Sequence, residues 1–204
     1  MKIKICGISR EQDIDYVNEA RPDFCGFVFA ESKRQVSPAQ AAGLKRRLAE
    51  GIAAVGVFVN APIENITALY RDGAINIAQL HGGEDGEYIT QLKKATGNTP
   101  IPVIQAVKSK NLSLLTAHSS LLTDYYLLDS GAGSGETFDW GLLNSLNIDK
   151  PWFLAGGINL DNIKRAIAVN PFGIDISSGA ETDGVKDRAK ILQLTAAVRK
   201  GSTV

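Results

Sequence analysis

The chain has 204 residues, of which 44% are hydrophobic, so it can bury one sizeable core without disulfides or metals. We therefore expect a single domain over residues 1–204. Its 22 lysines and arginines balance its 22 aspartates and glutamates, which argues against nucleic acid or an anionic membrane as the main partner. The expected partner is a small molecule.

The sequence also lacks the marks of a membrane or secreted protein. Its longest apolar run, residues 52–59, is too short to span a bilayer, and the first residues do not form a signal-type segment. We expect a soluble, cytoplasmic protein. The two cysteines, Cys6 and Cys25, do not form a C-x-x-C pair and have no paired histidines beside them, so neither a disulfide framework nor a zinc site is indicated.

The first half of the chain predicts strands that alternate with helices. In the first strand, Ile3 and Ile5 face one side and Cys6 faces the other. Gly7 frees the backbone to turn, and Ser9 is expected to cap the helix that follows. Strands are predicted at residues 2–7, 24–29, 53–59 and 77–80, and further helices after Ser37-Pro38, after residues 60–62 and around Tyr88, Leu92 and Ala95.

The second half repeats this pattern. Strands are predicted at residues 102–107, 125–128, 152–155 and 173–176, and helices at residues 112–117, after Asp139, after Asn159 and around Ile191, Leu194 and Val198. Eight strands that alternate with eight helices predict the α/β class and a (β/α)8 TIM barrel. An open, doubly wound sheet is the alternative. The strands are short and similar in length, and none reads as an isolated edge strand, which favours the closed barrel.

In such barrels the active site lies at the carboxyl ends of the strands, so the residues that follow each strand are the candidates. They are Cys6, the Lys33-Arg34 loop, Asn60, His81, Asp129, Gly156-Gly157 and Ser177-Ser178-Gly179. The glycines after the last two strands, with a short helix starting near Gly179, indicate an anion site that fits a phosphate. Asp129 follows two leucines, where a carboxylate is costly to bury unless it is bonded or used. Cys6 is either a reactive thiol or a small buried hydrophobe.

A glycine-rich loop, residues 131–135, follows the sixth strand. It fails the dinucleotide-binding pattern G-x-G-x-x-G because Glu136 stands where the third glycine belongs. We expect residues 131–137 to form a flap over the site, with a slack loop as the alternative.

Nine motifs occur in order along the chain: residues 4–8 (KICGI), 26–29 (GFVF), 32–34 (SKR), 56–60 (GVFVN), 79–82 (QLHG), 127–129 (LLD), 133–140 (GSGETFDW), 154–157 (LAGG) and 175–181 (DISSGAE). Together they resemble the phosphoribosylanthranilate isomerase family of tryptophan biosynthesis. The resemblance implies an Amadori rearrangement of N-(5-phosphoribosyl)anthranilate to 1-(o-carboxyphenylamino)-1-deoxyribulose 5-phosphate.

The resemblance also implies roles for single residues. Asp129 matches the family's general acid and Cys6 its general base, so Asp129 must hold a proton and Cys6 must be partly ionised near neutral pH. Arg34 matches the residue that grips the anthranilate carboxylate. The expected phosphate ligands are Gly156, Gly157, Ser178 and Gly179, and the expected substrate contacts include His81. The implied partner is a phosphosugar, with no cofactor or metal, and the implied assembly is a monomer, with a homodimer as the alternative.

Three other functions are weighed against this one. Cys6 argues against the histidine-pathway sugar isomerase, in which we would expect an aspartate base at the end of the first strand. The presence of both Cys6 and Asp129 argues against a noncatalytic barrel that only binds a phosphorylated ligand. A thiol redox protein requires that Cys25, which we expect in the core, reach Cys6, and that depends on the fold.

Overall fold

The computed structural model describes residues 1–108, 122–129, 140, 143 and 148–201 of the protein. Its strands are β1 (Lys2–Cys6), β2 (Phe24–Val28), β3 (Ala53–Phe58), β4 (Ile77–Leu80), β5 (Val103–Lys108), β6 (Tyr125–Asp129), β7 (Trp152–Ala155), β8 (Gly173–Ile176), β9 (Glu181–Thr182) and β10 (Val185–Lys186). Its helices are α1 (Glu11–Ala20), α2 (Pro38–Arg47), α3 (Ile63–Arg71), α4 (Gly86–Ala95), α5 (Ile163–Ala168), the 3-10 helix η4 (Ser178–Ala180) and α6 (Arg188–Gly201).

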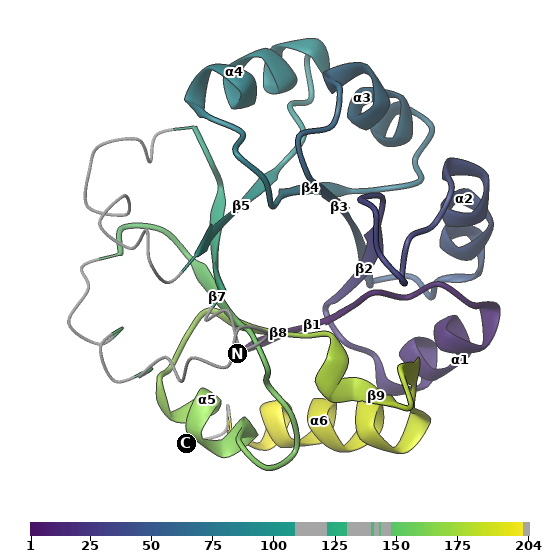
Figure 1. Cartoon of the computed structure of the whole chain (residues 1–204), viewed down its shortest axis with the longest axis vertical. Helices are drawn as coiled ribbons and strands as arrows, with labels where there is room; N and C mark the ends of the chain where they lie inside the picture. Colours follow the sequence, from purple (N-terminus) through teal and green to yellow (C-terminus); the bar gives the residue numbers. More distant parts are fainter. Residues whose placement is uncertain (109–121, 130–139, 141–142, 144–147, 202–204) are drawn as a thin grey trace.

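Strands β1 to β8 form a closed parallel barrel with helices around it (Figure 1). Each strand pairs with the next, and β8 pairs with β1, where Lys4 lies opposite Asp175. The predicted (β/α)8 barrel is therefore confirmed, and the open sheet is wrong. The expected helix at residues 112–117 and the expected flap at residues 131–137 lie outside the described residues, as does Asp139 with most of the helix after it.

The alternation along β1 separates two parts of the core. Ile3 and Ile5 face outward and pack with residues of α1 and α6, as the alternation predicted. The barrel interior is filled near the amino ends of the strands by aromatic rings, with Phe153 between Phe24 at 5.4 Å and Phe172 at 5.5 Å between ring centroids. These rings close the barrel at the amino ends of its strands, so a ligand must enter at the carboxyl ends.

Two of the expected helix caps are wrong. Helix α1 begins after Arg10, because the buried carboxylate of Asp13 accepts the backbone N–H groups of both Ser9 and Arg10. Helix α5 begins after Asn162, because the Asn159 side chain instead accepts the N–H of residue 161 within a turn. The expected cap of α2 is confirmed, since Ser37 Oγ accepts the N–H of residue 40.

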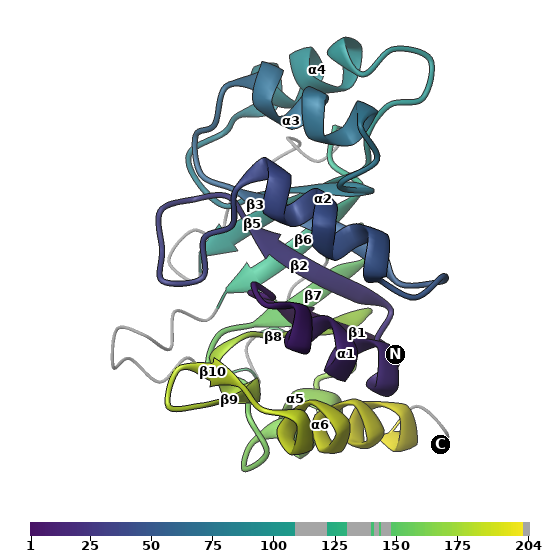
Figure 2. The ribbon, with the colours of Figure 1, turned by 90° about the vertical axis from the view of Figure 1, so that its right-hand side faces the viewer.

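The loops that follow the strands gather on one side of the barrel. Figure 2 shows the β2–α2 loop and the β9–β10 hairpin on the side opposite the chain's amino end. The hairpin comes directly after η4, and its two strands pair Glu181 with Lys186. Segments from the two ends of the chain therefore meet at the carboxyl mouth of the barrel.

Candidate active site

A cavity of 240 Å³ opens at the carboxyl ends of the strands and gathers most of the residues that the sequence predicted. Its lining includes Cys6, Arg34, His81, Asp129, Gly156, Gly157, Ser177 and Ser178. A larger cavity of 660 Å³ lies outside the barrel beside α2 and α3, but Asp72 is the one titratable side chain in its lining. Because proton transfer needs titratable groups, the smaller cavity is the candidate site.

Cys6 ends β1 with its thiol inside the barrel, where glycines make room for it. A Cβ atom at residue 26, on the neighbouring strand, would stand 2.8 Å from the Cys6 sulfur. Gly7 has φ +82°, the turn that the sequence predicted, and a Cβ there would meet Arg34 at 2.4 Å. Residue Cys6 is 7% exposed. Burial raises the pKa of its thiol, and the charge of the Lys4 ammonium offsets only part of this effect.

We expect Gly26→Ala to displace the Cys6 thiol. The new Cβ would also lie 3.0 Å from the Cys6 backbone, so the barrel must shift, at about 1–3 kcal/mol of unfolding free energy. Urea denaturation measures that loss, and kcat should fall with it. Gly43→Ala is the matched control, because Gly43 lies in α2 with its nearest neighbour atom 3.8 Å from the added carbon, and we expect it to stabilise the protein. Unchanged kcat in Gly26→Ala would show that the thiol's position is not critical.

The second cysteine is separated from the first by the sheet. Cys25 is fully buried in the outer core cluster, between the barrel and its helices, as the sequence predicted. Cys6 faces the interior of the barrel, and both thiols are free. A disulfide between them would require the sheet to open, so the thiol redox function is not supported.

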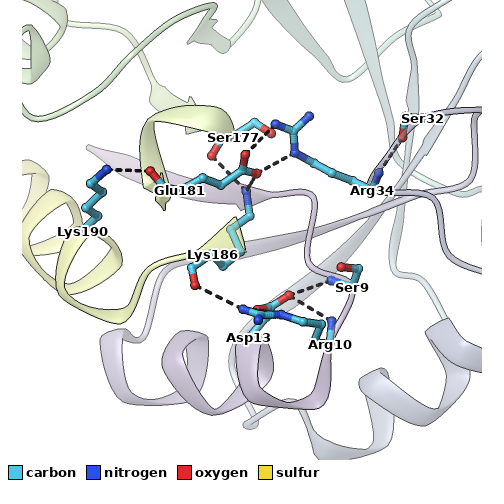
Figure 3. Close-up of polar contacts among 9 residues, drawn as sticks. All are labelled: Ser9, Arg10, Asp13, Ser32, Arg34, Ser177, Glu181, Lys186 and Lys190. Carbon is cyan, nitrogen blue, oxygen red and sulfur yellow. Dashed lines mark hydrogen bonds and ion pairs between the residues drawn. The ribbon is translucent and has the colours of Figure 1, made fainter. Parts of the chain in front are cut away.

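Arg34 is held by an acidic partner from the other end of the chain (Figure 3). Its Nε donates to Glu181 Oε1 at 2.6 Å and its Nη2 to Oε2 at 2.7 Å, which makes a bidentate ion pair. Lys186 Nζ donates to Glu181 Oε1 at 2.7 Å and to the Ser177 carbonyl at 2.9 Å. Two cations and one anion leave this cluster with net positive charge beside the cavity.

The cluster changes the acidity of its carboxylate. Burial alone raises the pKa of Glu181, but the hydrogen bonds from Arg34 and Lys186 lower it to about 2, from an ordinary value of 4.5. The charged carboxylate therefore stabilises the folded protein above about pH 4.5, and this contribution is lost as the pH falls toward about 2.

We expect Glu181→Gln to lower the free energy of unfolding at pH 7 by about 3 kcal/mol, because it leaves the Lys186 ammonium buried without its counter-charge. Urea denaturation at several pH values measures the effect, and the difference from the unchanged protein should shrink between pH 4.5 and 2. The double variant Glu181→Gln/Lys186→Met is the control and should recover part of the loss. A pH-independent difference would contradict the ion-pair explanation.

Asp129 ends β6 and lies across the barrel mouth from Cys6, since β6 and β1 are separated by two strands around the ring. His81 Nε2 lies 3.3 Å from Asp129 Oδ2, and Gln79 Nε2 lies 3.1 Å from His81 Nδ1. With the Gln79 amide as donor, His81 Nδ1 accepts and His81 Nε2 carries the proton directed at the carboxylate. His81 thus orients Asp129 from the end of β4.

The expected phosphate ligands lie at the ends of the neighbouring strands β7 and β8. Gly156, Gly157 and Ser178 line the cavity, and Gly179 lines an adjoining one of 330 Å³. The short helix begins at Ser178, one residue before the expected position. A Cβ at residue 179 would stand 1.8 Å from the Ile158 carbonyl oxygen, so glycine lets the two strand-end loops pack together.

Sequence reasoning missed four charged residues at or beneath the mouth: Lys4, Asp175, Glu181 and Lys186. The alternation along the first strand carried a signal for Lys4, because it shares a face with Cys6. Nothing in the local pattern signalled Glu181 and Lys186, which follow the last barrel strand in a hairpin. Asn60 and Lys33, named as strand-end candidates, do not line the cavity.

Titratable side chains collected at the carboxyl mouth of a closed eight-stranded barrel are the mark of barrel enzymes, and this chain is one of that class. The family model for N-(5′-phosphoribosyl)anthranilate (PRA) isomerase matches residues 3–197. The N-(5′-phosphoribosyl)anthranilate isomerase of Endomicrobium trichonymphae is 46% identical over 201 residues, which are 97% of this chain and 98% of that protein. The chain therefore belongs to the phosphoribosylanthranilate isomerase family and is an isomerase of tryptophan biosynthesis.

Solved structures agree with this assignment. TrpF from Jonesia denitrificans superposes with a TM-score of 0.85 at 33% identity, covering 100% of this chain and 98% of that one. A phosphoribosylanthranilate isomerase in complex with reduced 1-(o-carboxyphenylamino)-1-deoxyribulose 5-phosphate superposes with a TM-score of 0.81 at 32% identity, covering 98% and 99%.

Two further features of the described residues bear on earlier expectations. None of their helices has both the length and the apolar character that a bilayer crossing requires. No group of three or more His, Cys, Asp or Glu side chains in this part of the chain is arranged to hold a metal ion.

Proposed function

We propose that the protein rearranges N-(5-phosphoribosyl)anthranilate to 1-(o-carboxyphenylamino)-1-deoxyribulose 5-phosphate, with Cys6 as general base and Asp129 as general acid. One observation carries the proposal: a thiol and a carboxylate line the same 240 Å³ cavity, together with Arg34 and the glycines after β7. An acid and a base on opposite sides of a small cavity suit a substrate that gains a proton at one atom and loses one at another.

Two proton transfers, one by Asp129 and one by Cys6, lead to an enol, and tautomerisation of the enol completes the reaction. Asp129 gives its proton to the ring oxygen, the C1–O bond breaks, and the nitrogen lone pair forms an iminium with C1. The Cys6 thiolate then takes the proton from C2, and the electron pair of that C–H bond forms a C1=C2 double bond while the iminium pair returns to nitrogen. The resulting enol becomes the ketone as its oxygen loses a proton and C1 gains one.

The charges around the cavity fit the two anionic ends of this substrate. The Glu181 carboxylate engages Nε and Nη2 of Arg34, so the guanidinium approaches the anthranilate carboxylate with its Nη1 edge. Lys186 offsets the charge of Glu181 and keeps the cluster cationic. The backbone N–H groups around Gly156, Gly157, Ser178 and Gly179 bind the phosphate.

The burial of Cys6 has a consequence for the base. A raised pKa means that a smaller fraction of the thiol is ionised at neutral pH, but each thiolate is a stronger base. Since the base acts in its ionised form, we infer that kcat/KM rises with pH through the neutral range. A single domain and a monomeric state are part of the proposal and stay predictions.

The test is conversion of freshly generated N-(5-phosphoribosyl)anthranilate by the purified protein, followed as the loss of its fluorescence with no metal added. The unchanged protein is expected to turn over the substrate, and a Cys6→Ser sample should do so about 10²–10⁴-fold more slowly. Absence of turnover in the unchanged protein would overturn the proposal. If such a protein still bound the phosphorylated ligand, the noncatalytic barrel would replace it, and the histidine-pathway substrate would be assayed next.

A further inference from the structure

Lys4 is a fully buried lysine inside the barrel. It lies two residues before Cys6 on β1 and shares its inward face, and its side chain has no exposed surface. Its Nζ donates to Asp175 Oδ1 at 3.0 Å, across the β1–β8 pair in which the two residues stand opposite each other. The aromatic rings lie below this ion pair and the Cys6 thiol above it.

Stability alone does not account for this pair. Removing two charges from water costs several kcal/mol per ion, and apolar residues of similar size often serve a core as well or better. The rest of the barrel interior is largely apolar, with residues such as Val55, Ile104 and Leu127 in its central cluster. A buried lysine in this apolar interior suggests a functional role, and the thiol of the candidate base lies next to it on β1, toward the carboxyl end of the strand.

Lys4 and Cys6 are two residues apart on the inward face of β1, so the Lys4 ammonium lies on the same side of the sheet as the thiol, where its charge lowers the pKa of Cys6. Burial alone lowers the pKa of Lys4, but Asp175 and Cys6 raise it, and the net shift is upward. The ammonium therefore stays charged in the barrel at neutral pH. Asp175 holds it in place from the neighbouring strand.

We propose that Lys4 is a positioning residue for the base: its ammonium, anchored by Asp175, is the counter-charge that stabilises the Cys6 thiolate. The inference rests on the proposed function, in which Cys6 must ionise before it takes the C2 proton. When the thiolate accepts that proton it becomes a neutral thiol, and the Lys4–Asp175 pair beneath it keeps its own charges unchanged.

Other charged or titratable groups face the thiol as well. Lys186 on β10 also favours the thiolate, whereas Asp175 on β8 opposes it. Arg34 interacts electrostatically with Cys6 from the β2–α2 loop, and Cys25 on β2 does so from the other side of the sheet. Among the cations Lys4 has the largest effect on the thiol, and Lys186 and Arg34 are both bonded to Glu181.

The rate at which iodoacetamide alkylates Cys6, measured against pH by mass spectrometry of the Cys6 peptide, reports the ionisation of this thiol without any substrate. We expect Lys4→Met to raise the apparent pKa of the thiol by about one unit or more, which slows alkylation at pH 7 by about tenfold. Lys2→Met is the matched control, because Lys2 lies on the same strand with its side chain 48% exposed at the far end, and its profile should be unchanged.

A second pair of variants keeps the test decisive if Lys4→Met does not fold. Asp175→Asn and the double variant Lys4→Met/Asp175→Asn both lack the buried carboxylate, so they differ only in the ammonium. The double variant should be alkylated more slowly and at a higher apparent pKa. Equal profiles in this pair, or an unchanged profile in a folded Lys4→Met protein, would overturn the inference. A protein that shows these shifts but does not convert the substrate would instead overturn the proposed function.

Discussion

Replacement of Cys6 by serine is expected to lower kcat by about 10²–10⁴-fold while the barrel stays folded. Serine fits the space that Gly26 leaves for the thiol, since its oxygen is smaller than sulfur. Its hydroxyl does not ionise near neutral pH, so no base remains to take the C2 proton. Because the proposed substrate contacts of Arg34 and the glycines would be retained, KM should change far less than kcat.

Steady-state fluorescence kinetics and thermal melting measure the two parts of this prediction. The matched control is Cys25→Ala, which also removes one thiol but from the outer core, and it should keep kcat near that of the unchanged protein. The unchanged enzyme should gain kcat/KM above pH 7, because burial raises the pKa of the Cys6 thiol. Near-normal turnover in Cys6→Ser would remove Cys6 from the role of base.

The barrel could be predicted from the sequence because its signals are local. Most strands are short apolar runs with a glycine or a polar residue close behind. Eight such runs with helices between them are typical of the (β/α)8 barrel. The helix starts could not all be predicted in this way. Ser9 is a good capping residue, but Asp13 reaches back from the first turn of α1 and accepts the N–H groups of Ser9 and Arg10, so the helix begins one residue later.

The site was predicted where strand ends alone position it. Cys6 and Asp129 end their strands, His81 directly follows β4, and all three line one cavity. Glu181 and Lys186 were missed because their role depends on a hairpin that folds back over the mouth of the barrel. There Glu181 meets Arg34, which lies 147 residues earlier in the chain. Long-range ion pairs of this kind leave no periodic pattern in the sequence.

The buried lysine was missed for a different reason. Charged residues are almost never fully buried unless they are paired, so a lysine in a strand is first assigned to the surface. Lys2 and Lys4 share one face of β1, yet Lys2 is half exposed and Lys4 is enclosed. Both lysines pair with a carboxylate, but Lys2 begins β1 at the rim of the barrel, whereas Lys4 lies inside it, opposite Asp175, once β8 has closed the barrel beside β1.

Replacement of Asp129 by asparagine should have an effect as large as the loss of the thiol, about 10²–10⁴-fold in kcat. The amide is nearly the same size as the carboxyl and can still bond to His81, so the fold and the cavity should be preserved. It has no acidic proton to give to the ring oxygen, so the furanose must open with a proton from water. The kinetic assay measures the loss, and thermal melting checks that the variant is folded.

A matched control separates the acid role from the mere loss of a negative charge. Asp15→Asn removes an exposed carboxylate from α1, far from the cavity lining, and should leave kcat unchanged. Alkylation of Cys6 in Asp129→Asn adds a second check, because a thiol that keeps its reactivity shows that the base side of the site is intact. If Asp129→Asn then turns over within a few-fold of the unchanged protein, ring opening does not depend on this carboxyl, and the acid must be sought elsewhere at the mouth, with His81 the first group to replace.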